Sequence, residues 1–164
     1  MPDIPVGKNL SVMNETQLLR LHGSIIDQLK ARGVVRTRNN PVGDYTEWLV
    51  AKALDLELVT NSAAGCDGTD SNGMRYRIKG RRVTPENNSR QLSAIRNLKK
   101  KNFDYLAAVV FDKDYAILDA VIIPHELVEE YASYRKHVNA HILHLRGAIL
   151  EDPRIKDFRG RINF

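Results

Sequence analysis

The spacing of apolar residues predicts two helices in the first third of the chain. Asn14 can cap the first helix, with Gln17 three residues later in a capping-box arrangement, and Gly33 ends the run. Between these ends apolar residues recur at helical spacing, at Leu18, Leu21, Ile25 and Leu29. Residues 36–42 have the composition of a loop, and a second helix is expected from about Gly43 to Leu54.

Further along the chain, short apolar runs between turn-forming residues predict strands. We expect these strands at 57–60, 66–69, 74–80, 105–111 and 115–123, the last two joined as a hairpin. A basic helix is expected from Ser89 to about Lys100, and another helix from Pro124, because proline suits a first helical turn. The pattern weakens after Tyr134, where 141–145 is compatible with a strand and the end of the chain with a short helix and tail.

This order of elements predicts an α/β (α+β) fold, with a central mixed sheet of four to five strands flanked by helices on both faces. The length of 164 residues suits one domain over 1–164, with an irregular arm at 1–10 and the core at about 40–130. The single cysteine, Cys66, is typical of a reducing compartment. Without an evident secretory signal or a long apolar run, we expect a cytoplasmic protein that is not inserted in a membrane.

Positive charge is concentrated in the middle of the chain. The protein has 25 Lys and Arg against 20 Asp and Glu, a net charge of +5 and a pI near 9.4. Between Arg75 and Lys101 the only acid is Glu86, among ten basic residues at 75, 77, 79, 81, 82, 90, 96, 99, 100 and 101. This segment is suited to phosphate contacts, and a solvated basic surface is the alternative interpretation.

Four features that suit phosphodiester chemistry fall in one short stretch of sequence. Glu47 lies in a predicted helix, Asp67 follows a Gly-Cys turn, and Ile78 and Lys79 lie near the end of a predicted strand. Carboxylates hold hard cations such as Mg²⁺, and a lysine can orient or deprotonate an attacking water or stabilise charge on phosphate. Residues on neighbouring strands can converge, because strands lie roughly 5 Å apart.

These residues resemble the PD-(D/E)XK nucleases, the restriction-endonuclease-like superfamily. The resemblance runs through GDYTEWLVAKAL, SAAGCDGTD and GMRYRIKGRR, and continues into LAAVVFD and AILDAVIIPHELV. It is closer still to a small bacterial family of that superfamily whose members usually read YQIKGRR. The resemblance implies a restriction-endonuclease-like core, with Glu47 as the helical acid, Asp67 as a metal-binding aspartate, Lys79 as the catalytic lysine and the Ile78 carbonyl as a metal ligand. The implied cofactor is Mg²⁺, with Mn²⁺ as a substitute, and the implied substrate is DNA.

Arg77 departs from the superfamily pattern, which has Glu, Asp or Gln two residues before the lysine. Because strand side chains alternate, Arg77 and Lys79 should share a face. A guanidinium cannot ligate a metal. Three interpretations follow: weakened metal binding, an inactive DNA-binding protein, or a variant in which Arg77 turns aside. Arg77 could also pair with Glu47 or Asp67 and lock an empty metal site.

Other candidate residues extend the expected DNA surface or compete with the nuclease site. The residues expected to contact DNA are Arg77, Arg81, Arg82, Ser89, Arg90 and Arg96. Asp70 is a rival to Asp67, but its place beside a turn favours a turn-forming role. On a helix, His137, His141 and His144 would share a face and could hold zinc, although ordinary packed or exposed histidines are the simpler interpretation.

The sequence therefore leads first to a metal-dependent DNA endonuclease, with a restriction, defence or repair system as the expected setting. The alternative is a catalytically impaired DNA-binding module on the same fold, and a third hypothesis is a protein-interaction subunit of a defence or repair complex. The expected partner is duplex DNA, and a homodimer would suit cutting of both strands. No nucleotide cofactor is expected, because the sequence has no phosphate-binding loop or Rossmann glycine pattern.

Overall fold

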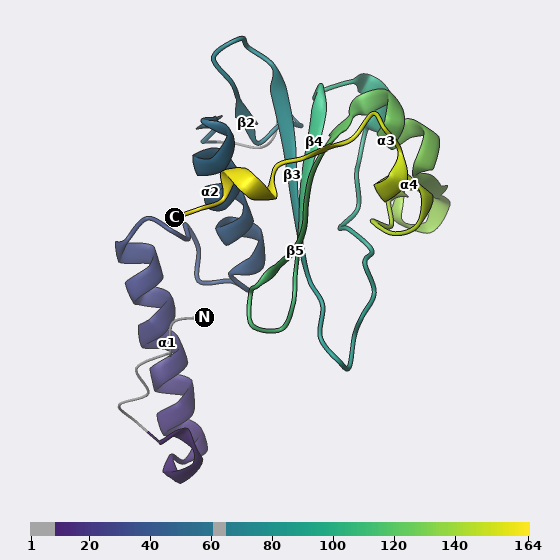
Figure 1. The fold of residues 1–164 in the computed structure, drawn as a ribbon. Helices are drawn as coiled ribbons and strands as arrows, with labels where there is room; N and C mark the ends of the chain where they lie inside the picture. The colour runs from purple at the N-terminus through teal and green to yellow at the C-terminus, as the bar shows by residue number, and fades with distance from the viewer. Residues whose placement is uncertain (1–8, 61–64) are drawn as a thin grey trace. The chain divides into compact units, whose positions relative to one another are not determined.

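A computed structural model describes residues 9–60 and 65–164 of the chain (Figure 1). Most of the expected irregular arm, residues 1–8, lies outside the described residues. The chain divides into two compact units, Met1–Pro41 and Val42–Phe164. The expectation of one domain over the whole chain stays a prediction.

The first unit contains a short 3-10 helix, η1 (Leu10–Val12), and the long helix α1 (Glu15–Ala31). The predicted capping box is confirmed: the Asn14 side chain accepts from the Gln17 amide at 2.9 Å, and the Asn14 amide donates to the Gln17 side chain at 2.9 Å. After the helix, Gly33 takes a φ of +71°, a left-handed conformation that favours glycine. The predicted start and end of this helix are therefore both confirmed.

The second unit is built on a mixed sheet of six strands, so the coarse fold prediction holds. Its order is β1-β2-β3-β4-β5-β8, in which β3 and β4 are parallel and all other neighbours are antiparallel. The strands are β1 (Glu57–Leu58), β2 (Gly68–Thr69), β3 (Arg75–Arg82), β4 (Tyr105–Phe111), β5 (Ile117–Pro124) and β8 (Lys156–Asp157). The sixth strand, β8, exceeds the four to five expected; it has two exposed residues and therefore no apolar pattern to reveal it.

The central strand β4 is apolar throughout because both faces of the sheet are covered. Its residues alternate between two hydrophobic clusters, one with Leu106, Ala108 and Val110, the other with Ala107, Val109 and Phe111. Helix α2 (Val42–Leu54) packs against the second set; α3 (His125–Tyr131) and α4 (Ala148–Glu151) pack against the first, on the opposite face (Figure 1). The prediction of helices on both faces is confirmed, as is the helix that follows Pro124.

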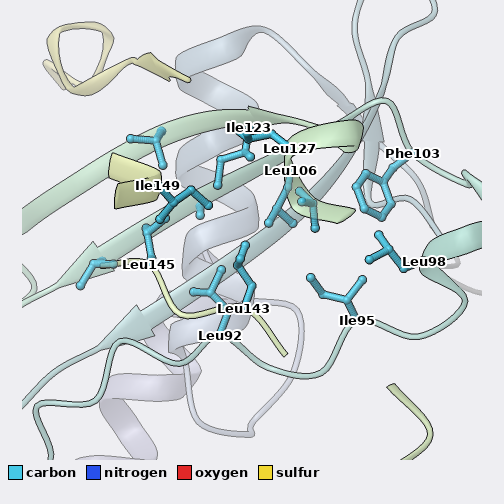
Figure 2. Packing of buried hydrophobic residues seen from close by; sticks show 14 of the residues in the cluster. Leu92, Ile95, Leu98, Phe103, Leu106, Ile123, Leu127, Leu143, Leu145 and Ile149 are labelled. Carbon is cyan, nitrogen blue, oxygen red and sulfur yellow. The ribbon is translucent and has the colours of Figure 1, made fainter. Parts of the chain in front are cut away.

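The basic helix predicted from Ser89 to Lys100 is wrong. Residues 83–104, which connect the parallel strands β3 and β4, are mostly irregular and end in a 3-10 turn, η3 (Leu98–Lys100). The Leu92 amide donates to Leu143 and the Ile95 amide to His141, both at 2.9 Å, so these amides bond to a distant segment instead of to the preceding helical turn. Leu92, Ile95 and Leu98 still point into the core (Figure 2), and their spacing of three therefore reflects burial rather than a helix.

The segment after α3 forms a small second sheet. Strands β6 (Ser133–Arg135) and β7 (Ala140–Ile142) pair antiparallel around a 3-10 turn, η4 (Lys136–Val138). The bridges Gln91↔His144 and Ile95↔His141 join residues 141–144 to the 83–104 connection. The histidine-rich stretch is thus strand and turn, so its histidines do not align on a helix. A last 3-10 turn, η5 (Arg159–Arg161), follows β8. Among the residues described, no helix is long and apolar enough to cross a membrane.

Candidate functional site

Asp67 is held against β3 by the antiparallel pairing of β2 and β3. Its backbone amide donates to the Tyr76 carbonyl at 2.7 Å, and its Oδ2 accepts from the Ile78 amide at 2.7 Å. The residue is 7% exposed, so its carboxylate is both buried and fixed in direction. Asp70 instead caps the turn, because its Oδ1 accepts from the Asn72 and Met74 amides, as its place in the sequence predicted.

Lys79 lies on β3, one strand away from Asp67, and is 9% exposed. Its Nζ donates to Ser93 Oγ at 2.8 Å and to the Ala94 carbonyl at 3.2 Å, both in the 83–104 connection. Burial, and then the positive charges of Arg77 and Arg96, lower the pKa of Lys79 to about 8, while the carboxylates of Asp67 and Glu47 act in the opposite direction. This ammonium therefore releases its proton at a lower pH than an ordinary lysine, but it is still mostly charged at pH 7.

Arg77 interacts electrostatically with both Asp67 and Lys79: it attracts the carboxylate and repels the ammonium. Its Nε is 3.7 Å from Asp67 Oδ2, an ion pair longer than a hydrogen bond, and the two side chains are 24% and 8% exposed. Of the interpretations open for Arg77, this arrangement is the one in which it pairs with Asp67. The buried carboxylate thus already has a cationic neighbour.

Glu47 is positioned by a close contact between α2 and β3. A Cβ placed on Gly80 would lie 2.0 Å from Thr46 Oγ1, so only glycine lets the helix approach the strand this closely. Thr46 is fully buried and donates to the Val42 carbonyl at 2.6 Å, which holds its hydroxyl on the helix. Glu47 follows directly, half-buried, and its charge acts on Lys79. The four positions singled out in the sequence therefore belong to one neighbourhood.

The residues around Asp67 do not fit a resident Mg²⁺ in this arrangement. Asp67 Oδ2 is committed to the Ile78 amide and faces the Arg77 guanidinium, whose charge opposes a cation. Among the described residues no group of three or more His, Cys, Asp or Glu is placed to hold a metal ion. Ile78 contributes its N–H to Asp67, and the metal-binding role expected for its carbonyl stays a prediction.

Most of the arginines expected to contact DNA are bonded within the protein. Arg81 donates to the Ser89 carbonyl at 2.7 Å; Arg82 donates to the Lys113 carbonyl and stacks over Tyr115; Arg90 pairs with Asp119. These contacts tie the ends of β3 and β5 to neighbouring loops. Their contact with DNA stays a prediction.

Ser89 and Arg96 complete the set of residues expected at DNA. Without a helix after it, Ser89 has no helix N-terminus with which to bind phosphate, and its Oγ accepts from the Gln91 amide at 3.3 Å. Arg96 is exposed and makes no hydrogen bond or ion pair with another described residue, and its charge acts on Lys79. Arg96 is therefore the member of the set that has no hydrogen-bond or ion-pair partner among the described residues.

Sequence reasoning missed Ser93 and Ala94, the partners of Lys79. Neither residue carries a chemical signal of its own, and the predicted helix gave their segment the wrong backbone. No protein-family model matches the chain, and no curated protein matches it either.

Proposed function

We propose that this protein binds DNA through the face of β3 that carries Arg77 and Lys79, and that it is a PD-(D/E)XK-type protein with a restriction-endonuclease-like core acting in the cytoplasm. The observation that carries the proposal is that two cations on one face of β3, Arg77 and Lys79, lie beside the buried carboxylate of Asp67, which directly precedes β2. This pair of cations suits a phosphodiester better than it suits a metal ion. The charged side chains of Arg77 and Lys79 donate hydrogen bonds, and neither offers a lone pair to a metal.

The wider surroundings support the same partner. Exposed basic residues continue from Arg96 to Lys99, Lys100 and Lys101 along the 83–104 connection. The mixed sheet with helices on both faces is the architecture predicted from the order of elements, and it is compatible with the restriction-endonuclease-like core that the resemblance implies. Neither point depends on a bound metal.

A binding experiment tests the proposal directly. Fluorescence anisotropy with a labelled duplex, in chelator and at rising salt, should show metal-independent binding whose affinity falls steeply with salt. Lys79→Met with Arg77→Met should weaken that binding at least tenfold, while Lys113→Met, an exposed lysine paired with Asp114, should leave it unchanged. Duplex binding that is absent in chelator at low salt would overturn the proposal.

Metal-dependent DNA cleavage is the second candidate function, and the pKa of Lys79 favours it. A lysine with a pKa of about 8 beside carboxylates is suited to accept a proton from an attacking water. This activity requires Arg77 to leave Asp67 so that a cation can approach. Nicking of plasmid DNA by the unaltered protein with Mn²⁺, stopped by chelator and by Lys79→Met, would establish it.

A further inference from the structure

We infer that a second, separate site for a phosphate group lies in a hollow formed by the small sheet and the connection between β3 and β4. The hollow has a volume of about 310 Å³ and is lined by Gln91, Arg135, His137, Val138, Ile142 and His144. It does not include Asp67, Arg77 or Lys79, and the inference does not rest on the function proposed for them.

The chemistry of the lining points to an anion. It supplies one guanidinium, two imidazoles and one carboxamide, and it contains no carboxylate. A guanidinium repels a metal ion, so His137 and His144 beside Arg135 suit phosphate rather than zinc.

The polar side chains of this lining have no competing partner within the described part of the chain. Arg135, His137, His144 and Gln91 make no side-chain hydrogen bond or ion pair there, in contrast to Arg81, Arg82 and Arg90. Gln91, Arg135 and His137 are exposed and His144 is half-buried, so their donors face solvent and can turn to a ligand without breaking a bond within the protein.

Backbone hydrogen bonds join the two segments that form the hollow, so residues that lie far apart in the sequence are already close together before a ligand binds. Gln91 and His144 form a bridge, the Leu92 amide donates to the Leu143 carbonyl at 2.9 Å, and the Leu145 amide donates to the Arg90 carbonyl at 3.0 Å. Ile142 is buried and supplies an apolar wall. The volume exceeds that of a phosphate alone and accommodates the attached sugar of a nucleotide or of a nucleic-acid strand.

Inorganic phosphate is the probe for the test, followed by the NMR signals of the histidine rings at constant pH and ionic strength. The signals of His137 and His144 should shift in a saturable way, while His22, an exposed histidine of the first unit, should not move. Arg135→Gln should weaken phosphate binding at least fivefold. Lys136→Gln, which removes the same charge from the next residue but does not line the hollow, should leave it unchanged.

Two further ligands distinguish the source of the phosphate. Saturation by a single-stranded oligonucleotide at lower concentration than by a nucleoside monophosphate indicates a nucleic-acid strand, and the reverse order indicates a free nucleotide; both support the site. Equal shifts at His22, equal shifts with chloride, or unchanged binding in Arg135→Gln would overturn it. Because Lys79→Met should leave these shifts intact, failure here and failure of the DNA-binding proposal at β3 are separate results.

Discussion

The two faces of β3 put neighbouring residues of one strand to opposite uses. Towards α2, Tyr76 and Ile78 enter the hydrophobic cluster and Gly80 touches Thr46. Towards the 83–104 connection, Lys79 and Arg81 are cations that donate to backbone or hydroxyl oxygens. The apolar and the charged residues alternate because successive side chains of a strand point to opposite faces. The packed apolar face therefore fixes the position of the charged face, although burial of those charges is itself unfavourable.

The largest effect is expected where the packed face is tightest. Gly80→Val should destabilise the protein by about 3 kcal/mol, because its Cβ would collide with Thr46 Oγ1 at 2.0 Å on a backbone that α2 and β4 both restrain. Urea unfolding measures the change. Gly43→Ala is the matched control: it lies in α2 with nothing within 4 Å of its added Cβ and should be neutral or stabilising by up to about 1 kcal/mol. Equal stability of Gly80→Val and the parent would show that α2 does not fix β3.

On the charged face, Lys79 should make stability depend on pH above neutrality. Its folded-state pKa of about 8 lies below its ordinary 10.5, so the unfolded chain holds the proton more tightly. Stability is therefore penalised below pH 8 and should rise by about 2 kcal/mol from pH 8 to pH 10, relative to Lys79→Met. Chemical denaturation of both proteins at several pH values measures this difference. A constant difference would mean that the lysine is not desolvated as the structure indicates.

The sequence predicts the part of this contrast that depends on contacts between residues close together in the chain. The sequence predicts that Asp67 and Lys79 lie close together, because a short hairpin and the strand period determine their positions locally. The ion pair of Arg77 with Asp67 was one of several alternatives, since alternation gives a face but not a partner. Their metal and catalytic roles stay predictions.

The surroundings of Lys79 could not be predicted, because they depend on contacts distant in sequence. Ser93 and Ala94 contact Lys79 because the backbone of their segment forms hydrogen bonds with residues 141–145 instead of forming a helix. Leu92, Ile95 and Leu98 fit a helix by spacing, and tertiary hydrogen bonds override that preference. The hollow lined by Arg135 and His144 comes from the same long-range pairing.

Arg77 should control whether the charged face accepts a metal. Arg77→Gln removes the cation beside Asp67 and supplies an oxygen ligand, so Mn²⁺ binding should tighten by about tenfold, roughly 1.4 kcal/mol, with a gain in plasmid nicking. The same change should raise the pKa of Lys79, because it removes a positive neighbour. Calorimetric metal titration and a nicking assay in Mn²⁺ measure the first two effects.

The control for Arg77 is a second substitution in the same site. Adding Asp67→Asn to Arg77→Gln should abolish both gains, because they act through that carboxylate. If Arg77→Gln binds metal no better than the parent, and the parent already nicks DNA in Mn²⁺, Arg77 does not suppress the site. Arg77→Lys, which keeps the charge, should behave like the parent protein.

The smallest effect separates a cation with a partner from one without, on a single segment. Arg96 is exposed and without a hydrogen bond or ion pair to the other residues described, whereas Arg90 is neutralised by Asp119. If phosphates are bound along the 83–104 connection, Arg96→Gln should reduce the slope of log affinity against log salt by about one unit, the contribution of one phosphate contact. Arg90→Gln should leave the slope nearly unchanged, because its charge is already compensated in the free protein. Anisotropy titrations of a duplex at four salt concentrations measure both slopes. Equal slopes for Arg96→Gln and the parent would remove this segment from the interface and leave Arg77 and Lys79 as the phosphate-binding groups on their own.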